Sequence, residues 1–595
     1  MAPRLLPFAL AAVLGASAAC GRKPVRDEKP DAPAAHQPEG ALRPRLDTTP
    51  PYVAADDGEG ARHWTTVRSF YEGNGFKPVW VSGRKPTPQA QALVEAVHKA
   101  EAEGLNAEEY DVPDPARMAA AASWSPLKKG LDDHEALDLE LRLSYAFVKY
   151  ATHLASGRTD PVSVDPHWFV TPRKVDAAAV MKQALHSGQV GETLRGLVPQ
   201  HPQYETLRET LARYREIAAR GGWPTLPENL RVRPGARGPQ VALLRARLAA
   251  TGDLAQPGSA DAVPSPAVPA PSASPAAASG PAPAAPAAPD GVFDASVRAA
   301  LKRFQRRHGL NGSGALDRPT LRALNVPVEV RIEQLTLNME RWRWLPESLG
   351  DRHILVNVPT YQLDVYENGQ VVLPMRVVAG KKDNPTPIFM DKMENVVFSP
   401  YWNVPPSIAR NETIPAAMRD PGYLDRNNME VVKGRHVVDP WSVSWSAVAA
   451  GNYTIRQRPG EKNALGHVKF LFPNQFDVYL HDTPAESLFA RTDRSFSHGC
   501  VRIEKPEELA EYVLRSQPEW TRERIRAAMF GGVEKWVTLK EPLPVYILYM
   551  TAWVDPDGAV QFREDIYGHD QKQQKLLPLL SPAPTRVAQV RPPTA

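Results

Sequence analysis

The sequence contains YLHDTP at residues 479–484 and FSHGCVR at residues 496–502, and these two stretches indicate both its fold class and its chemistry. The segment 475–480 alternates as a β-strand does and ends just before His481. A cysteine acts as a nucleophile only as a thiolate, which needs a base or a cation beside it. His481 stands nineteen residues before Cys500, and a hairpin-like return over that distance would bring the two side chains together. The two stretches therefore predict a cysteine–histidine site at the end of a strand.

Gly499, directly before the cysteine, allows a tight backbone turn at the nucleophile. Exposed N–H groups of Gly499 and Cys500 would then be placed to hold the oxyanion of a tetrahedral intermediate. The order of the residues disfavours a papain-like enzyme, in which the cysteine precedes the histidine by a long stretch. Here only His569 follows Cys500, and we expect it in a polar tail.

The region before these stretches has the period-two pattern of β-strands. Segments 354–358 and 361–366 alternate, Asn368-Gly369 is a strong hairpin signal, and segment 371–378 returns. We therefore expect a mostly-β domain that begins near residue 352. Helical spacing prevails upstream of it, so the fold class is multidomain α+β.

Length and charge limit the classes of protein to be considered. A chain of 595 residues is too long for one compact core, and roughly three or four domains are expected. Subtracting 67 Asp and Glu from 71 Lys and Arg gives a net charge of +4, which argues against a nucleic-acid binder. The two cysteines, Cys20 and Cys500, are too few for a disulfide framework, so each needs its own explanation.

The first cysteine ends a segment with the pattern of a secretory signal. After a positively charged start, residues 5–19 are uncharged and mostly apolar, and Ser-Ala-Ala precedes Cys20. Residues 1–20 resemble a bacterial lipoprotein signal, which implies lipidation of Cys20 and a membrane anchor. Gly21, which follows, implies sorting to the outer membrane. An ordinary signal with an incidental cysteine is the alternative.

The middle of the chain contains a small module with a long insertion. Residues 255–290 are almost wholly Pro, Ala and Ser, with too few large apolar side chains to offset the entropy of folding, so we expect a disordered loop. The flanks have apolar residues at i, i+3 and i+7, so the two halves can close on a common core. Residues 229–326 resemble the peptidoglycan-binding type 1 domain, a three-helix module. A helical spacer is the alternative.

The block around Cys500 resembles the signature of the L,D-transpeptidase (YkuD-type) catalytic domain, in which a histidine is followed by a Ser-His-Gly-Cys-hydrophobic-Arg/Asn block. Every position of that block matches here, and the resemblance extends over residues 351–540. With a helical domain and a wall-binding module upstream, the layout is similar to the large transpeptidases of Gram-negative bacteria, which implies a periplasmic enzyme of cell-wall biogenesis. In that subgroup a capping subdomain lies at about 411–450. We expect a mobile lid there, and a plain surface insertion is the alternative.

The resemblance implies a role for each residue of the two stretches. Cys500 attacks the L-centre carbonyl of diaminopimelate (Dap) in a tetrapeptide stem, D-Ala leaves, and a thioester remains. His481 is the base, oriented by the backbone carbonyl of Asp482, and an acceptor amine from a neighbouring stem completes a 3–3 cross-link. No cofactor is implied. The backbone N–H groups of Gly499 and Cys500 form the oxyanion hole. Arg502 binds a substrate carboxylate, and Tyr479 lines the donor cleft. Ser497 and His498 support the loop or the substrate.

Other functions remain open at this stage. Transfer of the acyl group to water would make an L,D-carboxypeptidase, and transfer to a protein amine would attach that protein to the wall. His467, His481, His498 and Cys500 are conceivable zinc ligands, but no HxH, HExxH or CxxC pair is present. A non-catalytic lipoprotein that only tethers the outer membrane to the wall is the alternative from another class.

The predicted organisation is a succession of segments with different roles. These are the signal 1–20, a disordered tether 21–60, a helical scaffold domain 61–228, the peptidoglycan-binding module 229–326, a connecting helix 327–350, the catalytic domain 351–540, a C-terminal hairpin 541–570 and a disordered tail 571–595.

Overall fold

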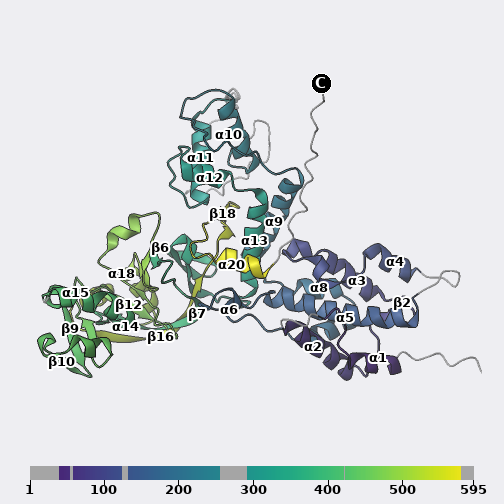
Figure 1. Cartoon of the computed structure of the whole chain (residues 1–595), viewed down its shortest axis with the longest axis horizontal. Coiled ribbons are helices and arrows are strands. Elements are labelled where there is room, and N and C mark those ends of the chain that lie inside the picture. Colours follow the sequence, from purple (N-terminus) through teal and green to yellow (C-terminus); the bar gives the residue numbers. More distant parts are fainter. Residues whose placement is uncertain (1–38, 54–57, 124–130, 255–290, 421, 578–595) are drawn as a thin grey trace, which may run out of the picture.

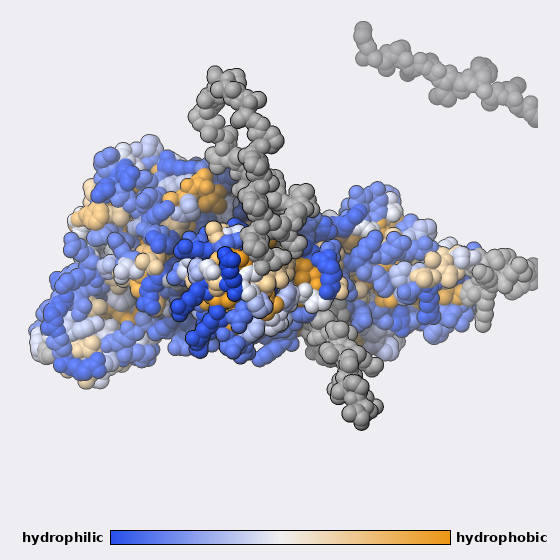
Figure 2. Space-filling view, turned by 90° about the horizontal axis from the view of Figure 1, so that it is seen from above, coloured by the Kyte–Doolittle hydropathy of each residue, from blue (hydrophilic) through white to orange (hydrophobic). Residues whose placement is uncertain are grey.

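A computed structural model of the chain describes residues 39–53, 58–123, 131–254, 291–420 and 422–577. Within these residues, buried apolar side chains form four separate clusters. Figure 1 shows a helical lobe at one end, a β-rich lobe at the other, and a small three-helix lobe beside the middle. The described surface is mostly hydrophilic in the view of Figure 2, with hydrophobic residues in small separate patches. Within the described part of the chain, no helix combines the length and apolar character needed to cross a membrane.

The helical lobe is built around the long helix α5 (Asp133–Ser156). A capping box starts this helix, because the Asp132 side chain accepts from the Glu135 N–H and the Glu135 side chain accepts from the Asp132 N–H. Both faces of α5 are largely buried among the other helices. These elements are α1 (Glu39–Leu46), α2 (Glu59–Gly73), α3 (Pro88–His98), α4 (Pro115–Ala122), α7 (Ala177–Ser187), α8 (Val190–Arg195) and the short strands β1 (Val81–Ser82) and β2 (Lys85–Pro86).

The prediction of a tether over residues 21–60 is wrong for residues 39–53 and for residues 58–60, which begin helix α2. Helix α1 packs on the helical lobe, and Leu42, Leu46 and Val53 are buried in its core. Leu42 and Leu46 are one helical turn apart, so they share a face, and their burial outweighs the cost of a proline within the helix. The predicted signal 1–20 with Cys20, and tether residues 21–38 and 54–57, lie outside the described residues.

The three-helix lobe joins two stretches that are far apart in sequence. Its helices are α10 (Pro239–Ala250), α11 (Ala295–Arg307) and α12 (Arg318–Leu324). Backbone bonds from Gly235 N to Phe293 O and from Gly238 N to Gly291 O, each 2.9 Å, join the halves, and both contribute to one apolar core. The insertion 255–290 between them lies outside the described residues.

The β-rich lobe contains a closed ring of strands. The order is β12-β13-β15-β6-β5-β4-β16-β7, and β7 also pairs with β12, so the ring has no free edge there. The pairs β13–β15 and β16–β4 are parallel, and the other pairs in the ring are antiparallel. The strands are β4 (Arg352–Asn357), β5 (Gln362–Glu367), β6 (Gln370–Gly380), β7 (Ile388–Phe398), β12 (Val468–Leu471), β13 (Leu480–His481), β15 (Val501–Ile503) and β16 (Lys535–Leu548).

Local sequence patterns correctly predicted one hairpin of the ring of strands, but they predicted another strand that is longer than the one observed. Asn368 and Gly369 have φ of 51° and 76°, the conformation that the tight turn between β5 and β6 needs. The strand predicted at 475–480 is wrong except for its last residue. The Asn474 side chain accepts from the N–H groups of Phe476 and Val478, which makes this segment a turn.

Helices cover the ring and link it to the other lobes. Strand β14 (Ser495–Ser497) pairs with β6, and α18 (Pro506–Leu514) and α19 (Arg522–Met529) follow β15. Helix α13 (Val328–Arg343) packs against α9 (Pro202–Ala219) and lies centrally between the lobes (Figure 1). The predicted hairpin after the catalytic domain is present in part, as β17 (Ala552–Val554) and β18 (Val560–Phe562), while residues 545–548 belong to the ring through β16.

The helical domain predicted at 61–228 does not form a single packing unit. After α6 (Pro161–Val164), strand β3 (Trp168–Phe169) pairs with β7, and Trp168 joins the core of the β-rich lobe. Here Trp168 contacts the ring of His569, with centroids 5.1 Å apart. The prediction of a polar tail is wrong for His569 and for residues 571–576, because α20 (His569–Leu576) is ordered and buries His569 and Gln573. Residues 578–595 lie outside the described residues.

The insertion in the β-rich lobe folds as a unit, which we call the cap subdomain (residues 402–457). Its sheet has the order β10-β9-β11-β8, and it has an apolar core of its own. It is wider than the predicted 411–450. The elements are β8 (Trp402–Asn403), α14 (Pro406–Ile408), a π-helical turn (Ala409–Thr413), α15 (Ile414–Arg419), α16 (Tyr423–Arg426), β9 (Met429–Lys433), β10 (His436–Val438), α17 (Trp445–Ala449) and β11 (Thr454–Gln457).

Candidate active site

The register of two parallel strands brings Cys500 and His481 to one face of the ring. Leu480 pairs with Val501 and His481 with Arg502, and Cys500 immediately precedes this pairing. Leu480 and Val501 are completely buried in the core. Because side chains alternate along a strand, Cys500, His481 and Arg502 all lie on the opposite face.

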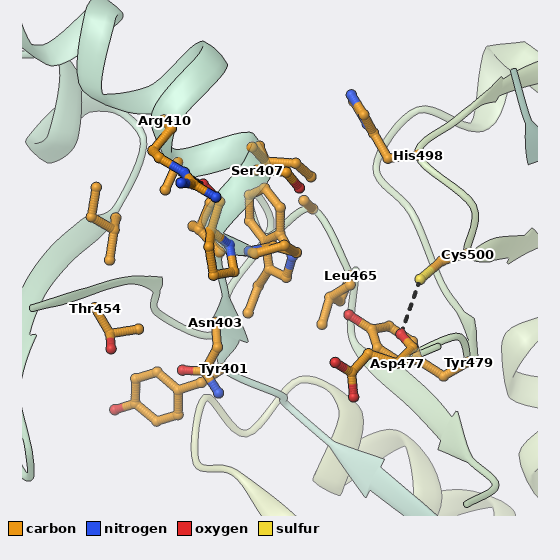
Figure 3. A pocket seen from close by; sticks show the side chains of 18 of the residues that line it. Tyr401, Asn403, Ser407, Arg410, Thr454, Leu465, Asp477, Tyr479, His498 and Cys500 are labelled. Atoms are coloured by element: carbon orange, nitrogen blue, oxygen red, sulfur yellow. Dashed lines mark hydrogen bonds between the residues drawn. The ribbon is translucent and has the colours of Figure 1, made fainter. Parts of the chain in front are cut away.

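A cavity of about 660 Å³ opens over this face, between the ring and the cap subdomain. Figure 3 shows Cys500, Tyr479 and Asp477 on one wall, and Ser407, Arg410 and Asn403 of the cap subdomain across from them. The cavity is therefore a site between two folded parts. Its lining includes the predicted residues Cys500, His481, Tyr479, Ser497, His498 and Arg502.

The ring of His481 is held by the next residue in the chain. His481 Nδ1 lies 2.6 Å from the Asp482 carbonyl oxygen, which can only accept, so Nδ1 bears the proton and Nε2 keeps a lone pair. The Asp482 carboxylate accepts from the His467 N–H at 2.8 Å and from the Thr483 N–H at 2.7 Å, which fixes this turn. Gly466, at φ 61°, is needed beside it, because a Cβ there would overlap the Asp482 carboxylate.

Burial and a neighbouring cation keep the imidazole neutral. Burial and the Arg502 charge lower the pKa of His481 to about 3. Burial raises the pKa of the Cys500 thiol to about 11, against the effect of hydrogen bonds from the Tyr479 backbone and hydroxyl and of the Arg502 charge. At neutral pH Cys500 is therefore a thiol and His481 a neutral imidazole.

The sulfur is directed by a contact that the motif does not reveal. Cys500 Sγ donates to the Asp477 carbonyl oxygen at 3.7 Å, the bond drawn in Figure 3. Asp477 has φ of 53°, a left-handed conformation that turns the chain just before Tyr479. Tyr479 then lies beside Cys500, and its hydroxyl stabilises the charged form of the sulfur.

The loop before Cys500 is fixed by one buried hydroxyl. Ser497 Oγ donates to the Cys500 carbonyl at 2.5 Å and accepts from the Gly499 N–H at 3.1 Å. Thr386 Oγ1 donates to the Gly499 carbonyl at 2.8 Å, and Gly499 has φ of 116°, which favours glycine. The Gly499 N–H is thus already occupied, so this structure does not offer it to an oxyanion. Within the described residues the Cys500 N–H donates to no other group and remains available.

The second histidine of the block faces the cap subdomain. His498 Nε2 lies 2.8 Å from Glu412 Oε1 in the π-helical turn, and the ring points away from Cys500 in Figure 3. The structure therefore does not bring His498 together with the sulfur, and it links the catalytic loop to the cap. The mobility predicted for this insertion stays a prediction.

Sequence reasoning missed several residues at the site. They include Lys469, Asp477, Thr386 and Glu412, which contact the predicted residues or line the cavity. Lys469 alone had a usable signal, because it is the one charged residue in the otherwise apolar segment 468–472, on the face opposite Val468 and Phe470. The positions of Lys469's neighbours at the site depend on pairings between strands that the sequence does not display.

The zinc candidates do not converge. No group of three His, Cys, Asp or Glu side chains that could hold a metal ion occurs among the residues that the structure describes. His467 lies against the ring of Phe530 instead, with centroids 4.4 Å apart.

Comparisons with known proteins match three parts of the chain. Residues 351–539 match the family model of the L,D-transpeptidase catalytic domain (YkuD). Residues 65–211 match a scaffold domain, and residues 279–324 match a peptidoglycan-binding domain. These matches confirm the resemblance to scaffold-bearing L,D-transpeptidases and the multidomain α+β class.

A curated protein with sequence similarity matches only part of the chain. A protein of Haemophilus influenzae named "Putative L,D-transpeptidase" is 33% identical over 270 residues, which is 44% of this chain and 54% of that protein. The chain thus matches about half the length of this curated relative.

Two solved structures match at low similarity. An L,D-transpeptidase from Mycobacterium smegmatis is 14% identical over 33% of this chain and 58% of that one, with a TM-score of 0.17. One from Xylanimonas cellulosilytica is 13% identical over 54% of this chain and 99% of that one, with a TM-score of 0.16. TM-scores of this size establish no shared overall fold.

Proposed function

We propose that this protein is a peptidoglycan L,D-transpeptidase that forms 3–3 cross-links through a thioester on Cys500. The observation that supports this most is the placement of Cys500 and His481 on the same face of paired strands, at one cavity. The Asp482 carbonyl contact leaves Nε2 of His481 as the ring nitrogen with a lone pair. A cysteine and a correctly protonated base at a cavity are the parts that nucleophilic acyl transfer requires.

In the first half-reaction the donor stem acylates the cysteine. The thiol proton passes to Nε2 of His481 as Sγ bonds to the L-centre carbonyl carbon of Dap. The carbonyl oxygen becomes an oxyanion, and the Cys500 N–H is the donor available to it. When the intermediate collapses, the C–N bond to D-Ala breaks, and the imidazolium gives its proton to the leaving amine. A thioester and free D-Ala result.

In the second half-reaction an amine takes the acyl group. The D-centre amine of Dap in a neighbouring stem attacks the thioester and loses a proton to His481. The C–S bond then breaks, sulfur recovers the proton, and the new amide is a Dap–Dap cross-link. The protons balance without a cofactor, because the thiol proton leaves with D-Ala and the proton of the attacking amine replaces it on sulfur.

The electrostatics of the site suit a base that works only during the reaction. A thiol pKa of about 11 beside an imidazole pKa of about 3 disfavours a resting ion pair. The hydroxyl of Tyr479 and the Arg502 charge both lower the pKa of Cys500, so they favour the thiolate as it forms. In this proposal Arg502 also binds a substrate carboxylate, since a guanidinium suits bidentate contact.

The remaining parts of the chain suggest where the enzyme acts. The three-helix lobe would bind the wall, and the helical lobe would serve as the scaffold. The signal-like N-terminus with Cys20 suggests a periplasmic lipoprotein held at the outer membrane by acyl chains.

The test is incubation of the purified full-length protein with tetrapeptide-rich sacculi, followed by muropeptide analysis and peptide mapping of Cys500. We expect Dap–Dap dimers, released D-Ala and an acyl adduct on Cys500, all absent in Cys500→Ala. Mapping is needed because Cys20 is a second thiol. Tripeptide monomers without dimers would indicate a carboxypeptidase instead, and sacculus binding without any adduct would indicate a non-catalytic wall binder.

A further inference from the structure

Two cationic side chains, Lys469 and Arg502, flank His481 on the face of the ring of strands that lines the cavity. Lys469 of β12 pairs with His481 of β13, and His481 pairs with Arg502 of β15. Direct register partners point to the same face of a sheet, and all three residues line the cavity. Neighbouring strands are about 4.8 Å apart, so the backbone positions of Lys469 and Arg502 are about 10 Å apart, one on each side of His481.

Neither cation has an acidic partner within hydrogen-bonding distance in the described part of the chain. Lys469 Nζ lies over two aromatic rings instead, 5.8 Å from the centre of Tyr479 and 5.6 Å from that of Trp536. Arg502 Nε is buried without a hydrogen-bond partner. Burial lowers the pKa of both side chains, and Glu534 opposes this only from a distance for Lys469. Charges so placed are costly unless an anion completes the site.

The order of the strands assigns a direction to the reaction. Cys500, which holds the acyl group, precedes β15, and His481, which handles the proton of the amine, lies on β13. The next strand on the amine side is β12, and its residue that pairs with His481 is Lys469. Asp477 is the acidic residue in the cavity lining, and it lies on the Cys500 side. A negative group attached to the amine would therefore meet Lys469 first.

We propose that Lys469 binds the α-carboxylate of the D-amino acid whose amine is released or accepted at Cys500. This inference rests on the proposed function. The leaving D-Ala has a carboxylate on the carbon next to its amine, and so does the D-centre of the accepting Dap. One cation beside His481 can therefore recognise the amine partner in both half-reactions. Arg502, on the strand that follows Cys500, is left to the acyl half of the donor.

The test compares two synthetic tetrapeptide donors, one with a free terminal D-Ala carboxylate and one with a terminal amide, in the full-length protein. Lys469→Met keeps the apolar stem and removes the charge. A charge-assisted hydrogen bond corresponds to about a 10- to 100-fold effect. We expect Lys469→Met to lower kcat/KM by that factor for the free acid and to leave the amide donor unchanged, with Lys469→Arg restoring most of the loss.

Lys535→Met is the matched control, because Lys535 Nζ also lies over a tryptophan ring, 4.8 Å from the centre of Trp520, but does not line the cavity. It should leave both donors unchanged. Equal alkylation of Cys500 by neutral iodoacetamide in wild type and Lys469→Met would show that the variant is folded and its thiol intact. Equal losses for both donors, or none for either, would overturn the carboxylate subsite. If wild type forms no thioester with either donor, the proposed function itself fails, and that outcome is distinct from the previous one.

Discussion

At the residue scale, Arg502 acts on Cys500 and His481, the proposed catalytic pair, in the same direction. It stands two residues after Cys500 and directly across from His481, and its charge lowers the pKa of both. Lys469, on the other side, also lowers the pKa of His481, and the Asp482 carbonyl raises it. Burial, together with these charges, keeps His481 deprotonated far into the acid range, and the Arg502 charge offsets part of the rise that burial causes in the pKa of Cys500.

Replacing Arg502 with glutamine should therefore shift the pH–rate profile to higher pH. Loss of the cation raises the pKa of His481 from its value of about 3, so the acid limb of kcat/KM moves to higher pH. The pKa of Cys500 also rises, so the alkaline limb of its alkylation by iodoacetamide shifts the same way. Profiles of wild type and Arg502→Gln measure both limbs. Arg522→Gln, an exposed position on α19, should change neither, and an acid limb that stays in place would contradict the assignment.

At the element scale, the loop from β14 to β15 depends on the buried hydroxyl of Ser497 more than on His498. Ser497→Ala removes the bonds to the Cys500 carbonyl and the Gly499 N–H, which are 2.5 and 3.1 Å long. We expect kcat/KM to fall by about 10- to 100-fold, because two bonds to the nucleophile loop are lost. His498→Ala removes one exposed contact with Glu412 and should change kcat/KM by at most about fivefold.

Transpeptidation kinetics on one donor, with Ser497→Thr as the variant that keeps the hydroxyl, measure this difference. Restoration by threonine but not by alanine would identify the hydroxyl as the cause. A larger loss in His498→Ala than in Ser497→Ala would show that the loop is organised from the cap subdomain instead.

What the sequence could predict at this scale depended on how local the cause was. The β5–β6 hairpin was predicted because Asn368 and Gly369 alone specify its turn. Cys500 and His481 were predicted from a motif. Lys469 was not, because its place beside His481 is set by the pairing of β12 with β13. Helices α1 and α20 were missed because short polar segments gave little signal, and their few apolar or amphipathic residues are buried against cores formed elsewhere.

At the scale of the whole molecule, buried polar contacts hold helix α13 to the segment that follows the ring of strands. Arg341 donates to the Tyr549 carbonyl at 3.0 Å, to Gln573 at 2.9 Å and to Asp570 at 2.6 Å. Asn338 bonds both the hydroxyl and the N–H of Thr551, each at 2.9 Å. These contacts hold residues 549–573, which follow the ring of strands in the sequence, against helix α13, which precedes the ring. The ring of strands itself also extends beyond the family match at 351–539, because residues 543–548 of β16 pair with β4 and β7.

A fragment cut at 351–539 should consequently fail to form the ring, whereas a fragment of residues 157–577 should keep it. The shorter cut removes residues 540–548, and with them the whole β4–β16 pairing and most of the central β7–β16 pairing. It also removes Val545, Ile547 and Leu548, each at most 2% exposed. Burying three such side chains contributes about 5–9 kcal/mol, comparable to the net stability of a whole domain. Denaturant unfolding followed by circular dichroism should therefore show a cooperative transition for 157–577 and none for 351–539. A cooperative transition of 351–539 at the midpoint of the longer fragment would mean that the ring can close without the last part of β16, and would limit the role of α13 and α20 to joining the lobes.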